Sequence, residues 1–214
     1  MADGLRLDAL VDALTLTEVG EHTYRAANAA TGHGVVFGGQ LLAQSIVAGA
    51  RGHQDKSVKT LHTVFARGAS PDHPLHIVVE PIHRGRTFAS SSVTISQGDR
   101  VCTRSTVLLD AEEPDTIRHA VPPGDVPGPD DCKPMGGSGG DWEVRVVDGV
   151  DIDDPALVGP PELDVWTRFT GSDIAPEHQQ ALVAFATDGF LIGTAMRPHE
   201  GVGQSQAHVT LATG

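Results

Sequence analysis

The chain has 214 residues, and 28 acidic side chains against 15 Lys and Arg give it a formal net charge of −13. Nucleic-acid binding needs a basic surface that displaces counterions from phosphates, so this charge argues against a nucleic-acid partner. No stretch approaches 18 consecutive apolar residues and residues 1–8 lack the features of a signal peptide, which predicts a soluble cytoplasmic protein without a membrane span.

Cysteine and histidine spacing gives no sign of a metal or a disulfide framework. Cys102 and Cys132 are far apart and form no CxxC pair. Five histidines fall between residues 53 and 83, but none has HxH or HExxH spacing. We therefore expect no metal and no cofactor.

The first half of the chain begins with a short helix over residues 5–16, where leucines recur with a partly helical period. Residues 15–27 read as a strand, and a glycine-rich approach at 32–40 leads into a helix over 40–50. That helix is apolar on nearly every side, which is typical of a buried helix.

Strands are predicted at residues 60–66, 75–82, 87–97 and 100–110, with a tight hairpin at Gly98 and Asp99. Short turns between them indicate an antiparallel meander. A buried helix followed by such a meander predicts a hotdog fold, in which a curved sheet wraps around a central helix.

Residues 113–140 are rich in Pro and Gly and predict a linker between an N-terminal module at 1–112 and a C-terminal module at 141–214. The second module offers strands at 142–147 and 163–169, then a helix from Pro176 through an apolar run ending at Met196. The predicted class is α+β, a double hotdog.

The second hotdog is expected to be truncated, because only residues 207–213 read as a strand after its helix. Such a module would leave open sheet edges, and open edges favour self-association. We therefore expect a homo-oligomer.

Asp188 is the strongest candidate for chemistry, because it lies inside the apolar run 184–192. Burial raises the pKa of a carboxyl group, and a buried carboxylate of raised pKa suits general-base catalysis on water. The alternative is that Asp188 caps a helix segment where Gly189 interrupts the run.

The start of the first helix is a second candidate. Gly38, Gly39 and Gln40 could present backbone N–H groups to an oxyanion or a phosphate. Alternatively, the glycines only let the loop pack tightly on the sheet.

Basic residues of the first sheet are candidates for phosphate contacts. They are Arg67, Arg84, Arg86 and Arg104. Arg84 and Arg86, with His62 on a predicted strand, are taken as substrate-binding residues. A solvated sheet edge is the alternative for the arginines, and a satisfied core or surface histidine for His62. No GxSxG motif is present, which disfavours a serine hydrolase of the α/β class.

Three segments in order resemble the type II acyl-CoA thioesterases. Residues 36–44 (VFGGQLLAQ) resemble the motif that opens the first helix of that family. Residues 61–70 (LHTVFARGAS) and 79–88 (VEPIHRGRTF) look like its strand–turn–strand, and 185–199 (FATDGFLIGTAMRPH) is similar to its second helix.

The resemblance implies hydrolysis of fatty acyl-CoA to free acid and CoA by direct water attack, hence a place in lipid and fatty-acid metabolism with acyl-CoA as partner. The family's catalytic set is an Asp on the second helix, a Ser or Thr on the next strand and a Gln near the C-terminus. Asp188 matches the first, and Thr213, or alternatively Thr210, the second. The Gln belongs to a late strand that this sequence is expected to lack.

Two other functions stay open. A non-catalytic acyl-CoA-binding hotdog protein is the first alternative, because of the expected missing strands. An enoyl-CoA hydratase is the second and less favoured, because neither helix start carries an Asp-x-x-x-x-His pattern.

Overall fold

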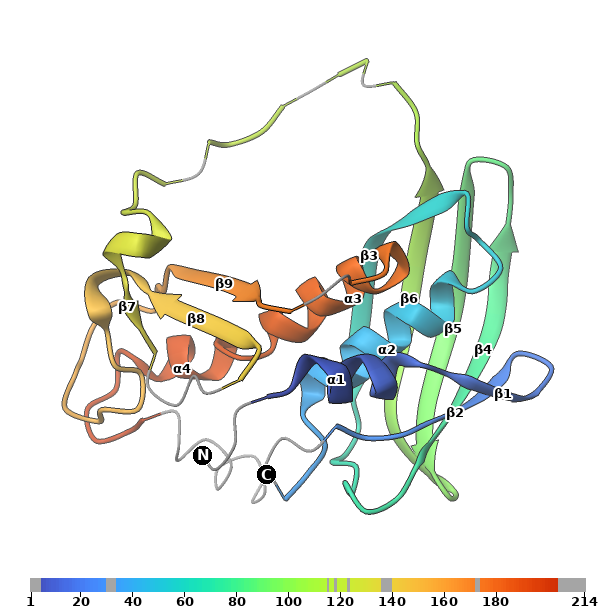
Figure 1. Cartoon of the computed structure of the whole chain (residues 1–214), viewed down its shortest axis with the longest axis horizontal. Helices are drawn as coiled ribbons and strands as arrows, with labels where there is room; N and C mark the ends of the chain where they lie inside the picture. The colour runs from blue at the N-terminus through green and yellow to red at the C-terminus, as the bar shows by residue number, and fades with distance from the viewer. Residues whose placement is uncertain are drawn as a thin grey trace.

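The computed structural model describes residues 5–29, 34–114, 116–117, 119–122, 124–135, 140–171 and 174–203. Two antiparallel sheets are present, one of six strands in the order β1-β2-β4-β5-β6-β3 and one of three in the order β7-β8-β9 (Figure 1). The elements are α1 (Leu7–Leu14), β1 (Thr17–Gly20), β2 (Thr23–Ala26), α2 (Gly38–Ala50), β3 (Lys56–Phe65), β4 (Leu75–Arg84), β5 (Phe88–Gln97), β6 (Arg100–Ala111), η1 (Pro129–Asp131), β7 (Lys133–Pro134), β8 (Trp142–Val146), η2 (Val147–Gly149), β9 (Val165–Phe169), α3 (Pro176–Thr187) and α4 (Leu191–Met196).

The predicted meander is confirmed for β4, β5 and β6. Leu75, Ile77 and Val79 of β4 alternate inward and are buried, as period-two patterning requires. Gly98 has a φ of +57° in the hairpin turn between β5 and β6, a conformation that favours glycine. Local sequence therefore specified this part of the sheet.

The position of β3 was predicted wrongly. A simple meander would place β3 beside β4, but β3 pairs with β6, and β2 occupies the edge of β4 instead. The single strand expected at 15–27 is a hairpin of β1 and β2, whose turn includes His22 at a φ of 52°. Because β2 covers the β4 edge, β3 pairs at the opposite edge of the sheet.

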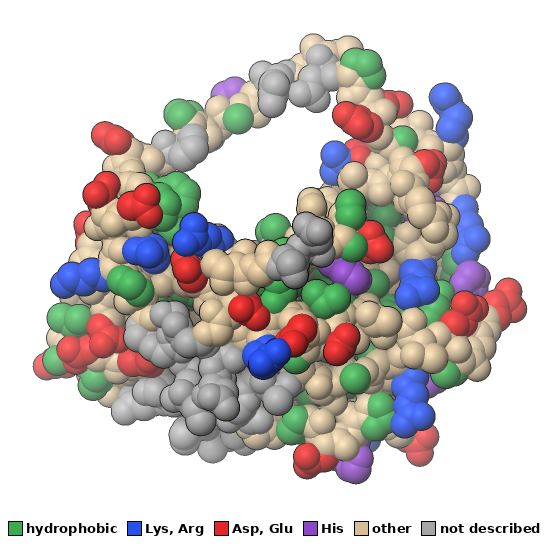
Figure 2. Space-filling view, viewed as in Figure 1, with side chains coloured by type: hydrophobic (Ala, Val, Ile, Leu, Met, Phe, Trp, Pro, Cys, Tyr) green, Lys and Arg blue, Asp and Glu red, His purple; other side chains and the backbone are tan. Residues whose placement is uncertain are grey.

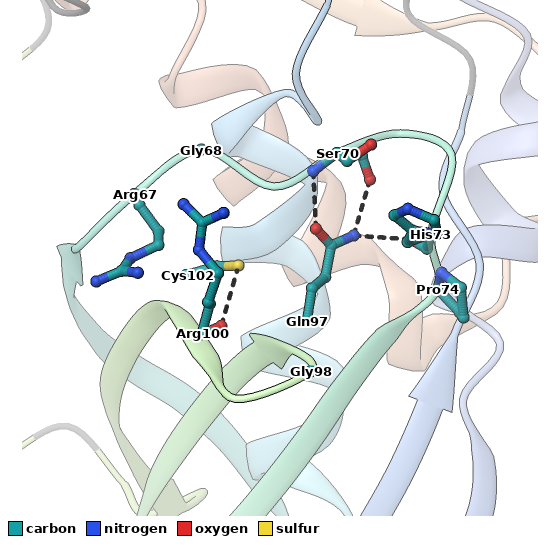
Figure 3. A pocket seen from close by; sticks show the side chains of 9 residues that line it. All are labelled: Arg67, Gly68, Ser70, His73, Pro74, Gln97, Gly98, Arg100 and Cys102. Carbon is teal, nitrogen blue, oxygen red and sulfur yellow. Dashed lines mark hydrogen bonds between the residues drawn. The ribbon is translucent and has the colours of Figure 1, made fainter.

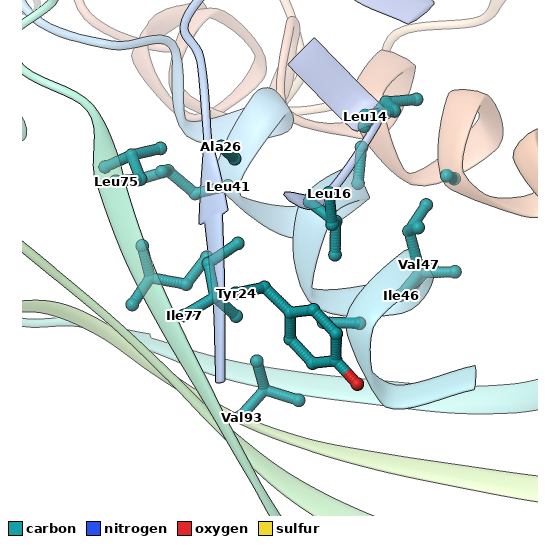
Figure 4. Close-up of a cluster of buried hydrophobic side chains, with 14 of the residues drawn as sticks. Leu14, Leu16, Tyr24, Ala26, Leu41, Ile46, Val47, Leu75, Ile77 and Val93 are labelled. Atoms are coloured by element: carbon teal, nitrogen blue, oxygen red, sulfur yellow. The ribbon is translucent and has the colours of Figure 1, made fainter. Parts of the chain in front are cut away.

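The central helix α2 lies in the concavity of the six-stranded sheet (Figure 1). Leu41, Ile46 and Val47 belong to the same buried cluster as Tyr24 of β2 and Ile77 of β4 (Figure 4). Full burial of each such side chain contributes about 1.5–3 kcal/mol to the hydrophobic driving force. These contacts give the expected hotdog arrangement.

The second module differs from the prediction in its helix. The expected continuous helix is broken, because α3 ends at Thr187 and α4 begins at Leu191. The α3 helix is also not buried on every side, since Val183 is 67% exposed. Helix α3 packs beside α2 and joins the second module to the first (Figure 1).

The described residues between β6 and η1 arch away from the rest of the chain (Figures 1 and 2). β7 lies within the stretch predicted as a linker and pairs with β8. The strand predicted at 207–213 lies outside the described residues. Of the helices described, none is both long and apolar enough to cross a bilayer.

Candidate active site at the α2–α3 junction

The Asp188 carboxylate lies against the first turn of α2. A Cβ atom added to Gly38 would come within 2.5 Å of Asp188 Oδ2. The backbone N–H of Gly39 donates a hydrogen bond to the same carboxylate. Phe37 at the N-cap provides no side-chain hydrogen bond, so the carboxylate takes the place of a helix cap.

Two adjacent glycines permit this close approach of helices α2 and α3. A Cβ atom at Gly39 would overlap the Phe185 carbonyl oxygen, which belongs to the α3 backbone. Any larger residue at Gly39 would therefore push the helices apart. The glycine pair sets the distance between Asp188 and α2.

Aromatic rings surround this junction. Phe185 of α3 makes edge contacts with Phe37 and Trp142, at ring-centroid distances of 5.0 and 5.4 Å. Trp142 of β8 also lies 6.2 Å from the Phe190 ring, in the turn that follows Asp188. Through these ring contacts, Phe37 of the first module is joined to Trp142 of the second sheet.

Burial raises the pKa of the Asp188 carboxyl above that of an ordinary aspartate. The Gly39 hydrogen bond lowers the pKa, but by less than burial raises it. The α2 N-terminus also carries a partial positive charge that favours the ionised form. The result is a half-buried carboxylate that is more basic than usual.

The structure brings three predicted residues together at this junction, namely Asp188, Gly38 and Gly39. Phe65, which the sequence reasoning did not select, also lies here, with Cε1 3.2 Å from the position of a Gly38 Cβ. Phe65 is the last residue of β3 and is 49% exposed. The only feature of the sequence that could have pointed to Phe65 is its place as an aromatic residue near the end of a predicted strand.

Gln40 is fully buried, and its amide group binds the segment before α2. Gln40 Oε1 accepts a hydrogen bond from the Ala29 N–H at 2.9 Å, and Nε2 donates to Asn28 Oδ1 at 3.1 Å and to the Ala27 carbonyl at 3.5 Å. Its hydrogen-bonding groups are thus engaged with residues 27–29.

His62 of β3, Arg84 of β4 and Arg86 of the β4–β5 turn are all exposed. Arg84 pairs with Ala89, Ala89 pairs with Leu109, and Leu109 pairs with Val58 near the start of β3. This register places Arg84 at the end of the sheet opposite Phe65. Thr213 and its alternative Thr210 lie outside the described residues.

Comparison with known proteins agrees with this architecture. Residues 26–109 match the family model of the acyl-CoA thioesterase N-terminal domain. Mouse acyl-coenzyme A thioesterase 8 is 30% identical over 97 residues, which is 45% of this chain and 30% of that protein. The human protein of the same name is 29% identical over 104 residues, 47% of this chain and 33% of its own. The match therefore spans about a third of these relatives.

Solved structures extend the likeness to the second module. The tesB protein of Mycobacterium avium subsp. paratuberculosis has a TM-score of 0.77 and 22% identity, covering 92% of this chain and 75% of its own. The acyl-CoA thioesterase II TesB2 of Mycobacterium marinum has a TM-score of 0.65 and 23% identity, covering 94% and 73%. At these low sequence identities, the similarity to the two solved structures shows a shared fold and nothing further.

Fold and junction together define an α+β protein of the double-hotdog type. Residues 26–109 resemble an acyl-CoA thioesterase N-terminal domain, and the predicted resemblance of the chain to the type II acyl-CoA thioesterases is confirmed.

Proposed function

We propose that the chain hydrolyses acyl-CoA thioesters, with Asp188 as the residue that activates water. One observation carries this proposal: a carboxylate whose pKa is raised by burial lies against the N-terminal turn of a central helix. A general base works best when its pKa approaches the working pH. The family of the N-terminal domain supplies the substrate class.

In the proposed reaction, Asp188 accepts a proton from a water molecule while the water oxygen attacks the thioester carbonyl carbon. The C–S bond then breaks, the free acid forms, and the CoA thiolate leaves and takes up a proton. The positive end of the α2 dipole stabilises the negative charge that develops on the carbonyl oxygen. No covalent acyl-enzyme is required.

Gly38 and Gly39 are proposed to contact the substrate through their backbone, because they border Asp188 directly. Thr213, with Thr210 as the alternative, remains the proposed second catalytic residue by resemblance to the family. The rings of Phe37 and Phe65 flank the same turn and offer an apolar surface for the acyl chain. The proposed setting is lipid metabolism in the cytoplasm.

A homo-oligomer is also proposed. Strand β3 is the edge of the first sheet and exposes Val64 and Phe65. An unpaired edge with apolar side chains is a template for pairing with another chain. Light scattering of the purified chain measures the mass, and a monomer at every concentration would contradict this proposal.

A thiol-release assay with acyl-CoA substrates of several chain lengths tests the activity. We expect release by the wild type and a loss of about 10²-fold or more in Asp188→Asn, because one general base contributes 10²–10⁴-fold. Asp12→Asn is the matched control, since Asp12 is an exposed carboxylate of α1. Cys102 and Cys132 are both buried, so the protein's own thiols add little background.

Assays on the same wild-type and Asp188→Asn proteins distinguish the thioesterase from the two alternative functions. Binding of acyl-CoA without thiol release would favour a non-catalytic acyl-CoA-binding protein. Loss of enoyl absorbance without thiol release would favour a hydratase. Equal activities of Asp188→Asn and the wild type would remove Asp188 from the mechanism.

A further inference from the structure

A pocket of about 490 Å³ lies at the end of the first sheet where β3 finishes and the β5–β6 hairpin turns (Figure 3). Its lining includes the basic side chains Arg67 and Arg100 together with His73. Ser70 and Gln97 add polar groups, and the buried Cys102 also lines it. Cationic and hydrogen-bonding groups therefore line one concave site.

Within the described parts of the chain, neither Arg67 nor Arg100 forms an ion pair with an acidic side chain. This matters in a protein with a net charge of −13, where carboxylates are abundant. Figure 2 shows acidic side chains spread over both modules. Two arginines without acidic partners at one pocket leave a local positive charge for an anion.

Hydrogen bonds connect the two segments that line the pocket, residues 66–73 and residues 97–102. The Gln97 side chain accepts from Ser70 N–H at 2.8 Å and donates to the carbonyls of Ser70 and His73 at 2.8 and 2.7 Å (Figure 3). The backbone N–H groups of Ala66 and Arg67 both donate to the Cys102 carbonyl, at 2.8 and 3.2 Å. A pre-formed site loses less conformational entropy when it binds a ligand.

The pocket lies at the same end of the sheet as Asp188. Arg67 lies two residues after Phe65, and the Phe65 ring lies next to Gly38, beside the Asp188 carboxylate. The loop after Arg67 is joined to the approach to α2 by a hydrogen bond from Val36 N–H to the Ala69 carbonyl at 2.8 Å. Arg84 and Arg86, the arginines chosen from the sequence, lie toward the opposite end.

We propose that Arg67 and Arg100 form a phosphate-binding subsite, and that it holds a phosphate of the coenzyme A moiety. The assignment to coenzyme A rests on the proposed thioesterase function. Guanidinium groups bind phosphate oxygens in bidentate fashion, which neutral polar pockets cannot match. The pantetheine arm of the substrate would then run from this pocket toward the α2–α3 junction.

Calorimetric titration with adenosine 3′,5′-bisphosphate, which carries phosphates of coenzyme A without a thioester, tests the subsite on the full chain. The Arg67→Gln/Arg100→Gln variant should bind about tenfold to hundredfold more weakly, as expected when charge-assisted hydrogen bonds are lost. Arg25→Gln/Lys59→Gln is the matched control, because it also removes two positive charges, both from exposed positions of the same sheet. Circular dichroism confirms that each variant is folded.

Other results would overturn the subsite. Equal weakening by the two double variants would mean that only net charge matters. Weakening in Arg84→Gln/Arg86→Gln, with none in Arg67→Gln/Arg100→Gln, would place the phosphates at the other end of the sheet. Binding of inorganic phosphate without binding of the bisphosphate would identify a free-phosphate site and reject coenzyme A.

KM measurements test the phosphate-binding subsite separately from the proposed thioesterase function. If the wild type releases thiol, Arg67→Gln/Arg100→Gln should raise the KM for acyl-CoA about tenfold or more relative to the KM for the acyl-pantetheine thioester, which lacks the nucleotide. An unchanged KM ratio would overturn the subsite and leave the thioesterase function intact. If the wild type releases no thiol, the proposed function fails, and the titration still decides whether phosphate binds here.

Discussion

The side chain of Gln180 pairs with the backbone of Val58 as a neighbouring strand would. The Val58 N–H donates to Gln180 Oε1 and Gln180 Nε2 donates to the Val58 carbonyl, both at 2.9 Å. Val58 belongs to β3, the edge strand, and Gln180 to α3. One amide thus joins the second module to the free edge of the first sheet.

Gln180→Leu should lower the free energy of unfolding by about 1 kcal/mol, because both hydrogen bonds are exposed and water replaces them in part. That loss corresponds to a Tm decrease of about 2–4 °C for a chain of this size. Urea and thermal unfolding followed by circular dichroism measure both. Gln179→Leu is the control, since Gln179 is an exposed neighbour on the same helix. Equal effects of the two substitutions would contradict a specific role for the Val58 pairing.

Gly39→Ala should destabilise the protein by about 1–3 kcal/mol, because the new Cβ would overlap the Phe185 carbonyl and the α3 backbone must move. Gly38→Ala meets the end of the Asp188 side chain instead, so it should reduce thiol release more than stability. Gly128→Ala, where no atom lies within 4 Å of the added Cβ, is the control. Urea unfolding and the thiol assay together separate the two glycines. A Gly39→Ala variant as stable as Gly128→Ala would refute the close packing of the helices.

The raised pKa of Asp188 predicts a pH dependence of both stability and activity. Because the folded-state pKa lies above the unfolded value, the native protein binds this proton more tightly than the unfolded chain does. The contribution of Asp188 to stability is therefore lost as pH rises from the ordinary aspartate pKa through the raised one. Asp188→Asn carries no such titration, so its stability relative to the wild type should increase across that window.

Thiol release should follow the opposite trend, since the ionised carboxylate is the proposed base. Activity of the wild type should fall as pH decreases through the raised pKa of Asp188, above the pH at which an ordinary aspartate would titrate. Unfolding curves and initial rates measured over the same pH series test both trends. A stability difference between wild type and Asp188→Asn that does not vary with pH would rule out a perturbed Asp188.

Gln40→Met should cost about 1–3 kcal/mol of stability, because it leaves the buried Ala29 N–H without its acceptor and removes the donor to Asn28. Gln54→Met, at an exposed turn position, is the control for loss of a glutamine amide. Urea unfolding compares the two. If they proved equally stable, the contacts of Gln40 with residues 27–29 would contribute nothing to folding.

Local patterns in the sequence determined most elements of this protein. The inward alternation of Leu75, Ile77 and Val79 predicted β4, the turn at Gly98 predicted the β5–β6 hairpin, and an all-round apolar run predicted the buried helix α2. The apolar run around Asp188 also indicated a buried carboxylate with a raised pKa. Each of these signals is encoded within a few neighbouring residues, through side-chain periodicity, turn chemistry and burial.

Only the tertiary structure decided which of these elements meet. It placed β3 beside β6, and it ended α3 at Thr187 so that Asp188 reaches the α2 N-terminus. It also brought Arg67 and Arg100 to one pocket while Arg84 lies toward the opposite end of the sheet. Pairing partners and helix contacts depend on which edges and faces remain open after other elements have packed. That competition involves segments far apart along the chain, so no local pattern encodes it.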